Sequence, residues 1–305
     1  MRNDKICTFA ALLSLTLTAC GEEISHTELV ADLSKNHIVH TLGGQRPAFL
    51  VLPADHDPET PIPLVLSLHG FTSHSAQHDR YFGLSKRVND DRFALIIANG
   101  TRDPDGKRFW NATDFCCDLH NTQVDDVKYL SGLLKEATTH IDVERIFALG
   151  HSNGGFMSYR LACEGIPGLV AIASLAGTSF SDPSHCAFAS PVSVLQIHGT
   201  NDKVVAYDGS TGEHEYAGAE EVALRWAALA RCDLTDPETL PPLDLDQKLD
   251  GPETVRTRYR TGCRNDVTIE LWTIEQGAHV PHFAPDFGQR LLEWLFNASR
   301  ADTLS

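Results

Sequence analysis

The chain has 305 residues, hydrophobic residues make up 42% of them, and the formal net charge is −16 at pH 7. This length and composition suit one large α/β domain, and no internal repeat or linker sets off a second one. The acidic excess argues against a nucleic-acid partner, because phosphate binding requires clustered lysine and arginine.

The N-terminus predicts export. Arg2 and Lys5 precede an apolar stretch, Ile6 to Leu17, that is too short to span a membrane. The stretch ends in Leu-Thr-Ala-Cys, which resembles a bacterial lipobox, so we expect residues 1–19 to be a signal peptide and Cys20 to be lipidated. The alternative is an ordinary signal peptide cut before Cys20. Either interpretation places the protein outside the cytoplasm, anchored at the bacterial cell envelope or secreted.

The rest of the chain predicts a flexible tether over residues 20–42 and a single domain over residues 43–299. In that domain short apolar runs alternate with helical patterns, which is typical of a mostly parallel sheet covered by helices on both faces. An acidic, proline-bearing stretch at 233–254 lacks an apolar period and is predicted to be a solvated insertion. We expect strands at Arg46–Leu52, Pro63–Leu68, Phe93–Ala98, Leu169–Leu175, Val192–His198, Val255–Arg260 and Val267–Ile274, and helices at Ala76–Val88, Val124–His140, Glu215–Arg231 and Phe287–Asn297.

One stretch, Gly150 to Gly154, carries the nucleophile-elbow pattern G-x-S-x-G. An apolar run precedes it and a helix-like segment follows it. Glycine fits where the chain turns abruptly from strand to helix, and that turn exposes the serine hydroxyl beside the first N–H groups of the helix. We therefore predict that Ser152 is a nucleophile.

A serine nucleophile needs a base and an acid that orients the base. In an α/β-hydrolase the acid and then the histidine follow the serine in the chain, each just after a strand. Asp202 and His279 occupy such positions. Asp208 and His282 are the alternatives that we rank below them.

Two backbone N–H groups are predicted to stabilise the oxyanion. One belongs to Asn153, and the other to Phe71 or, as the alternative, to Thr72 in the loop after a buried strand. We expect the substrate pocket to include Thr72, Trp110 and His151; Trp110 lies in a long polar stretch, Asp103 to Asn121. The serine mechanism needs no metal or organic cofactor, and none is expected. A metal site is also disfavoured because no C-x-x-C pair occurs and the histidines do not cluster with the cysteines.

An even number of cysteines remains once the signal peptide and Cys20 are set aside, which indicates disulfides in an exported protein. The six cysteines allow 15 pairings. Sequence order favours Cys163–Cys186 and Cys232–Cys263, each of which closes one loop between neighbouring elements. Cys116 and Cys117 are then left as an adjacent pair.

Several strings carry a resemblance to one family: LHGFTS, WNATDFCCD followed by VDDVKYL, GHSNGGFMSYRLAC, HGTNDKVVAY and GAHVPHF. From about Gly43 to the last helix, the chain resembles the polyhydroxybutyrate depolymerase and feruloyl esterase group. These are secreted α/β-hydrolase esterases related to acetyl xylan esterases. The resemblance implies the same Ser-Asp-His triad and favours the same two long-range disulfides. A departure follows His279, where Val280 replaces the tryptophan of the family's Trp-Pro pair.

The sequence thus predicts a monomeric serine ester hydrolase whose partner is a small or oligomeric ester. Polyhydroxyalkanoate oligomers, feruloyl esters and acetyl esters of plant cell walls all fit. Two alternatives are a non-catalytic lipoprotein that binds esters or glycans on a hydrolase scaffold and a peptidase of the prolyl-oligopeptidase type. The peptidase normally carries a propeller or cap domain, for which no sequence is present.

Overall fold

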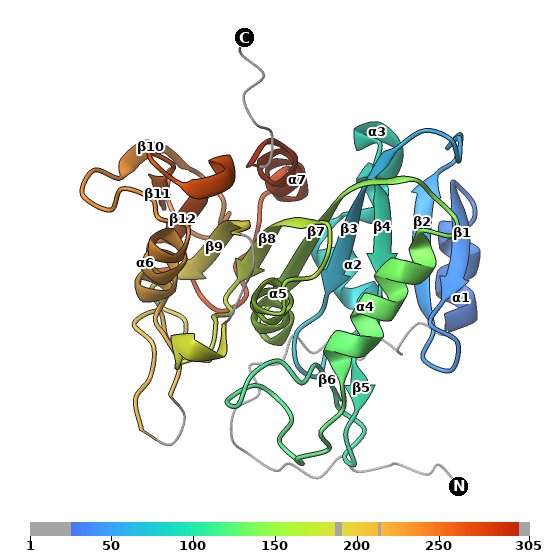
Figure 1. The fold of residues 1–305 in the computed structure, drawn as a ribbon, viewed down its shortest axis with the longest axis horizontal. Helices are drawn as coiled ribbons and strands as arrows, with labels where there is room; N and C mark the ends of the chain where they lie inside the picture. The colour runs from blue at the N-terminus through green and yellow to red at the C-terminus, as the bar shows by residue number, and fades with distance from the viewer. Residues whose placement is uncertain (1–25, 187–190, 213–214, 299–305) are drawn as a thin grey trace, which may run out of the picture.

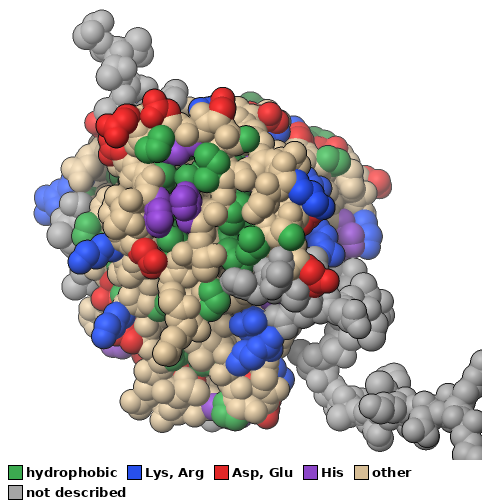
Figure 2. Space-filling view, turned by 90° about the vertical axis from the view of Figure 1, so that its right-hand side faces the viewer, with side chains coloured by type: hydrophobic (Ala, Val, Ile, Leu, Met, Phe, Trp, Pro, Cys, Tyr) green, Lys and Arg blue, Asp and Glu red, His purple; other side chains and the backbone are tan. Residues whose placement is uncertain are grey.

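The computed structural model describes residues 26–186, 191–212 and 215–298. The predicted signal peptide and Cys20 lie outside the described residues, so lipidation stays a prediction. Within the described part of the chain, no helix has both the length and the apolar character needed to cross a membrane. Figure 2 shows acidic side chains gathered along the upper rim of the face at the β1 end of the sheet, in keeping with the negative net charge.

A ten-stranded sheet forms the centre of the molecule (Figure 1). Across the sheet, the strands are β1 (His37–Leu42), β2 (Ala48–Pro53), β4 (Ala94–Ile97), β3 (Ile62–Leu68), β7 (Val143–His151), β8 (Leu169–Leu175), β9 (Ser193–Gly199), β12 (Ile269–Ile274), β11 (Thr254–Tyr259) and β10 (Glu238–Leu243). The strands from β4 to β12 are parallel, and two antiparallel strands extend the sheet at each end. This arrangement confirms the predicted mostly parallel sheet.

Helices cover both faces of the sheet, with α4, α5 and α6 on one face and α1, α2, α3 and α7 on the other (Figure 1). Along β3, Leu64 and Leu66 belong to the core under the first face and Val65 to the core under the second. Both faces of the strand are therefore buried, which explains its continuous apolar sequence. The helices are α1 (His26–Leu33), α2 (Ser75–Phe82), α3 (Val88–Asp91), α4 (Asp126–Ala137), α5 (Asn153–Cys163), α6 (Ala219–Leu229) and α7 (Phe287–Ala298).

The predicted flexible tether at 20–42 is wrong for its described part. That part forms α1 and β1, and β1 pairs with β2 over its whole length. Leu42 is fully buried, while the other side chains of β1 are partly or well exposed. Because β1 is an edge strand with few buried side chains, its sequence lacks the apolar run that revealed the central strands.

The acidic stretch at 233–254 is also more ordered than predicted. It contains β10, which pairs with β11 and forms the other edge of the sheet. Pro241 and Pro242 lie in β10, where an edge strand tolerates a residue that lacks the N–H group. The side chains of β10 are largely exposed, as predicted for a solvated segment, but Leu245 is fully buried.

All three predicted disulfides are confirmed. Cys163–Cys186 and Cys232–Cys263 join positions 23 and 31 residues apart, and Cys116 is bonded to its neighbour Cys117. The last pair lies in the long segment between β6 (Arg108–Phe109) and α4; β6 pairs with the equally short β5 (Thr101–Arg102). Because Cys116 and Cys117 are adjacent, this bond constrains the backbone at those two positions and closes no larger loop.

Candidate active site

Ser152 lies at the tip of a sharp turn between β7 and α5. It is the N-cap residue of α5, and its φ of 53° and ψ of −121° are strained for a residue with a side chain. The Ser152 N–H donates to the carbonyl of Leu175 in the neighbouring strand, at 2.7 Å. The turn is thus anchored to the sheet while the serine side chain remains partly exposed.

The elbow glycines are required by close backbone contacts. A Cβ at Gly150 would lie 2.2 Å from the Gly154 backbone, and a Cβ at Gly154 would lie 2.0 Å from the Leu68 carbonyl oxygen. A Cβ at Gly70 would lie 3.4 Å from the Cβ of Ser152. The loop after β3 therefore packs directly against the predicted nucleophile, as the sequence suggested.

His279 and Asp202 lie together. The Nδ1 atom of His279 is 2.7 Å from Oδ2 of Asp202, and the Asp202 side chain is fully buried. An ionised carboxylate can only accept, so Nδ1 carries a proton, and in the neutral tautomer with this proton Nε2 has a free lone pair. Asp208 and His282, the two alternatives, are both exposed.

Asp202 is held in its ionised form by four donors. Its Oδ1 accepts the backbone N–H groups of Val204 and Val205, at 2.8 and 2.9 Å. Its Oδ2 lies 3.3 Å from Nε2 of His198, which is also 2.8 Å from the Val205 carbonyl oxygen. Burial alone raises the pKa of Asp202, but the hydrogen bonds from His198 and His279 outweigh it and hold that pKa well below its usual range.

Two side chains hold the loop that carries His279. His151 donates from Nε2 to the His279 carbonyl at 2.9 Å, and the Tyr81 hydroxyl donates to the Pro281 carbonyl at 2.9 Å. Burial and then the nearby His279 lower the pKa of His151 to about 3, so this ring is neutral at ordinary pH. His151, which the sequence predicts to be a pocket residue, thus contacts the loop that carries His279.

Of the two candidate donors in the loop after β3, only Phe71 has an N–H group without an acceptor among the residues described. Thr72 has its N–H bonded to the carbonyl of Arg108 at 2.8 Å, which removes it from the pair of candidate donors. Within the described residues, the N–H groups of Phe71 and Asn153 have no acceptor. Phe71 therefore fits the predicted donor position better than Thr72, whose exposed side chain remains available to a substrate.

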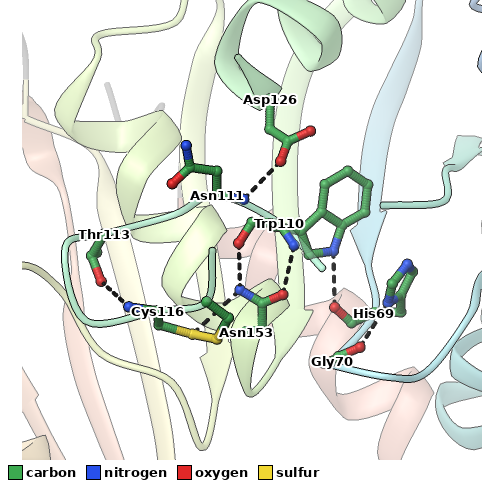
Figure 3. Close-up of a disulfide and its surroundings, with 9 residues drawn as sticks. His69, Gly70, Trp110, Asn111, Thr113, Cys116, Asp126 and Asn153 are labelled. Atoms are coloured by element: carbon green, nitrogen blue, oxygen red, sulfur yellow. Dashed lines mark hydrogen bonds between the residues drawn. A yellow bond between two sulfur atoms is a disulfide. The ribbon is translucent and has the colours of Figure 1, made fainter. Parts of the chain in front are cut away.

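Trp110 does not line an open pocket, contrary to the prediction. Its side chain is fully buried, and its indole N–H donates to the His69 carbonyl at 2.9 Å. Figure 3 shows Trp110 between His69 and Asn153. The motif that contains Trp110 identified an important position, but an isolated sequence does not tell a buried tryptophan from a surface one.

One group of side chains could hold a metal ion among the residues described. It consists of Asp103, Asp105 and His120, whose ligand atoms lie within 4.8 Å of one another. Lys107 already provides a cation there, because its Nζ lies 3.6 Å from Oδ2 of Asp105. None of these residues belongs to the predicted triad, and no step in ester cleavage requires the group.

Comparison with solved structures agrees with an α/β-hydrolase fold. The structure of an acetyl xylan esterase from Aspergillus awamori is similar, with a TM-score of 0.62 and 13% sequence identity. The match covers 85% of this chain and 99% of the esterase chain. The fold, with its parallel sheet and its serine elbow between β7 and α5, defines this chain as an α/β-hydrolase. No protein-family model matches the chain.

Curated relatives identify the family. A probable feruloyl esterase C from Aspergillus clavatus is 30% identical over 215 residues, which cover 67% of this chain and 68% of that protein. Feruloyl esterase B from Piromyces equi is 25% identical over 246 residues, covering 77% of this chain and 42% of that protein. The chain belongs to the feruloyl esterase family. The chain matches a smaller share of the length of other relatives, for example 42% of the putative esterase NocK from Nocardia uniformis.

Proposed function

We propose that the protein is a serine carboxylic-ester hydrolase. The observation that carries this proposal is the 2.7 Å contact between His279 and the buried carboxylate of Asp202, next to a serine elbow. A neutral histidine with its Nδ1–H bound to a carboxylate has its Nε2 available as a base. Family membership supports the same reaction class.

The proposed reaction has two acyl-transfer steps. The Oγ of Ser152 attacks the ester carbonyl carbon while Nε2 of His279 takes the hydroxyl proton, and the oxyanion accepts hydrogen bonds from the N–H groups of Asn153 and Phe71. The C–O bond to the alcohol then breaks, and His279 gives its proton to the departing alkoxide. Water, deprotonated by His279, attacks the acyl-enzyme, and collapse of the second intermediate returns the proton to Ser152.

Esters of plant cell walls are the proposed substrates, and an aromatic acyl group fits the surroundings best. Val204 is 56% exposed two residues after Asp202, and Val280 is 37% exposed directly after His279. Exposed aliphatic side chains on both loops favour an apolar group beside the triad. A feruloyl group offers such a surface, whereas an acetyl group is too small to use it.

Replacing Ser152 with Ala tests the reaction. Hydrolysis of an aryl acetate should fall roughly 10⁴- to 10⁶-fold, because the nucleophile is lost while the fold is kept. A Ser152→Ala variant with the wild-type rate would refute the proposal. Methyl ferulate, acetylated xylan and hydroxybutyrate oligomers then compare the acyl groups, and a higher kcat/KM for acetylated xylan would contradict the feruloyl preference.

We also propose that the protein is exported and anchored through Cys20. The three disulfides support export, since such bonds persist in oxidising compartments. A Cys20→Ser variant of the full chain should leave the membrane fraction and appear in the soluble fraction. Continued sedimentation of that variant with membranes would contradict the lipid anchor.

A further inference from the structure

The two proposed oxyanion donors come from separate parts of the fold. Asn153 begins α5, whereas Phe71 lies in the loop after β3. Their N–H groups must face one oxygen atom, and donors that stabilise a transition state have to be fixed before the charge develops. The strands that precede the two donors pair with each other as far as Leu68 and Gly150, but both donors lie beyond this pairing. The orientation of the Phe71 peptide relative to Asn153 therefore depends on contacts made within the loops.

Trp110 makes hydrogen bonds to both segments (Figure 3). Its backbone N–H donates to Oδ1 of Asn153 at 2.7 Å, and its backbone carbonyl accepts from Nδ2 of the same residue at 2.8 Å. On the other side, its indole N–H donates to the carbonyl of His69 at 2.9 Å. The same residue is thus bonded to the first residue of α5 and to the loop that carries Phe71.

The contacts continue to the peptide that carries the Phe71 donor. The ring of His69 donates from Nδ1 to the Gly70 carbonyl at 2.8 Å, and its Nε2 accepts the N–H of Gly100 at 2.9 Å. The Gly70 carbonyl and the Phe71 N–H belong to one planar peptide and point in opposite directions when it is trans. A hydrogen bond that fixes the carbonyl therefore also fixes the direction of the proposed donor.

The surroundings keep Trp110 in place. The Trp110 and Asn153 side chains are fully buried, where hydrogen bonds are strong and costly to leave unmade. The guanidinium of Arg46 lies 5.2 Å from the centroid of the Trp110 ring, and Oδ2 of Asp126 accepts the next backbone N–H, that of Asn111, at 2.7 Å. Nδ2 of Asn153 also lies 3.3 Å from the sulfur of Cys116.

We propose that Trp110, acting together with the side chain of Asn153, is a positioning residue that fixes the two oxyanion donors relative to each other. We call these contacts the Trp110 bridge: the bonds from Trp110 to Asn153 and to the His69 carbonyl, and the bond from His69 to Gly70. This role rests on the proposed ester hydrolase function. It assigns Trp110 to transition-state stabilisation rather than to substrate contact.

Trp110→Phe removes the indole N–H and keeps most of the ring. The matched control is Trp294→Phe, because Trp294 is also buried and donates its indole N–H to a distant acceptor, Oε2 of Glu270, at 2.9 Å. Relative to this control, Trp110→Phe should lower kcat on an aryl acetate about 10- to 100-fold, somewhat less than the loss of a whole donor. KM should stay within about threefold of the control, because the carbonyl oxygen carries little charge in the bound substrate and becomes negative only in the transition state.

Benzeneboronic acid gives a second readout, because it forms a tetrahedral adduct with a serine Oγ and uses the oxyanion donors. Its affinity should fall in parallel with kcat in Trp110→Phe and stay unchanged in the control. Asn153→Ala should have a similar effect, and the double variant should be little worse than either single one, because both substitutions break the same bridge. Asn153→Ala also keeps the question answerable if Trp110→Phe does not fold.

The outcomes separate the two proposals. If hydrolysis depends on Ser152 but both bridge variants keep kcat and boronate affinity within about twofold of the control, the bridge has no positioning role and the esterase proposal stands. If KM and kcat change equally in the control and the bridge variants, the effect is general destabilisation and the positioning role is rejected. If hydrolysis does not depend on Ser152, both proposals fall.

Discussion

Two buried polar networks in this protein are built differently. In the site region, Trp110, His69 and Asn153 bond mainly to backbone groups of loops at the carboxyl ends of the parallel strands. The Glu270 region lies at the end of the sheet where β12 pairs with β11. There Glu270 accepts hydrogen bonds from two indole N–H groups and from an arginine. These partners are side chains on β11, β12 and α7.

The difference between the networks indicates a division of roles. Strands and helices already have their backbone fixed by regular hydrogen bonds, so polar side chains between them mainly contribute to stability. Loop backbones lack such bonds and take their conformation from side chains that reach them. We therefore expect changes in the site region to alter activity more than stability, and changes in the Glu270 region to do the reverse.

Asp202→Asn should give the largest effect. An amide retains an acceptor for the N–H groups of Val204 and Val205 but no longer favours the Nδ1–H form of His279, so kcat should fall roughly 10³- to 10⁴-fold. Steady-state hydrolysis together with thermal unfolding checks both parts. A folded variant that keeps activity within about tenfold of the wild type would contradict the assignment of Asp202 as the orienting acid.

Glu270→Gln should affect stability instead. Glu270 is 1% exposed and accepts from Trp272, Trp294 and Arg256. A glutamine would place an NH₂ group against one of these donors and leave the guanidinium without its counter-charge, which should cost about 2–4 kcal/mol of unfolding free energy. Urea denaturation measures this loss. A kcat per folded molecule that dropped more than about threefold would break the comparison between the regions.

His69 should make stability depend on pH. Burial lowers its pKa to about 3, against 6.5 for an unperturbed histidine. Between these values the unfolded chain binds a proton that the folded chain does not, so this contribution to stability is complete above about pH 6.5 and is lost as the pH falls toward 3. His69→Gln should have a lower Tm at about pH 7 but lose less Tm on acidification to about pH 4 than the wild type.

An exposed histidine supplies the control for that measurement. His282→Gln changes a surface side chain and should leave both the Tm and its change with pH close to those of the wild type. Equal acid sensitivity of the His69→Gln variant and the wild type would show that protonation of His69 does not contribute to acid unfolding.

Replacing Cys116 and Cys117 with Ala should lower activity less than Asp202→Asn or Trp110→Phe. The Cys116 sulfur accepts one hydrogen bond from Asn153, while the two bonds between Asn153 and Trp110 remain. We expect kcat to fall by less than about tenfold, which is less than in Trp110→Phe. A larger loss than in Trp110→Phe would mean that the disulfide, rather than the tryptophan, is the main support of the elbow.

The matched control for the Cys116–Cys117 pair is the disulfide between Cys232 and Cys263, outside the site region. Replacing Cys232 and Cys263 with Ala removes a bridge between residues 31 apart and should lower stability by about 2–4 kcal/mol. It should leave kcat per folded molecule within about twofold of wild type, because no proposed site residue contacts this disulfide. Kinetics and urea denaturation of both double variants decide the point.

The sequence by itself was enough to predict the parallel core and to select the candidate reactive residues. Strands buried on both faces read as apolar runs, and G-x-S-x-G requires glycine where a Cβ at Gly150 or Gly154 would collide with backbone. Asp202 and His279 were found because parallel strands bring their carboxyl ends to one edge of the sheet. Cysteine order in the chain was also enough to predict the three disulfides that the structure contains.

Only the tertiary structure decided which contacts support those residues. Trp110 was expected at a substrate pocket, yet it is fully buried between two loops that lie far apart in the sequence. His198, His151 and Tyr81 contact Asp202 or the His279 loop of the proposed triad, each through one polar contact. Such contacts leave no periodic pattern in a sequence, because they depend on where loops meet in space. The edge strands β1 and β10 escaped prediction for a related reason, since a mostly exposed strand has no apolar period.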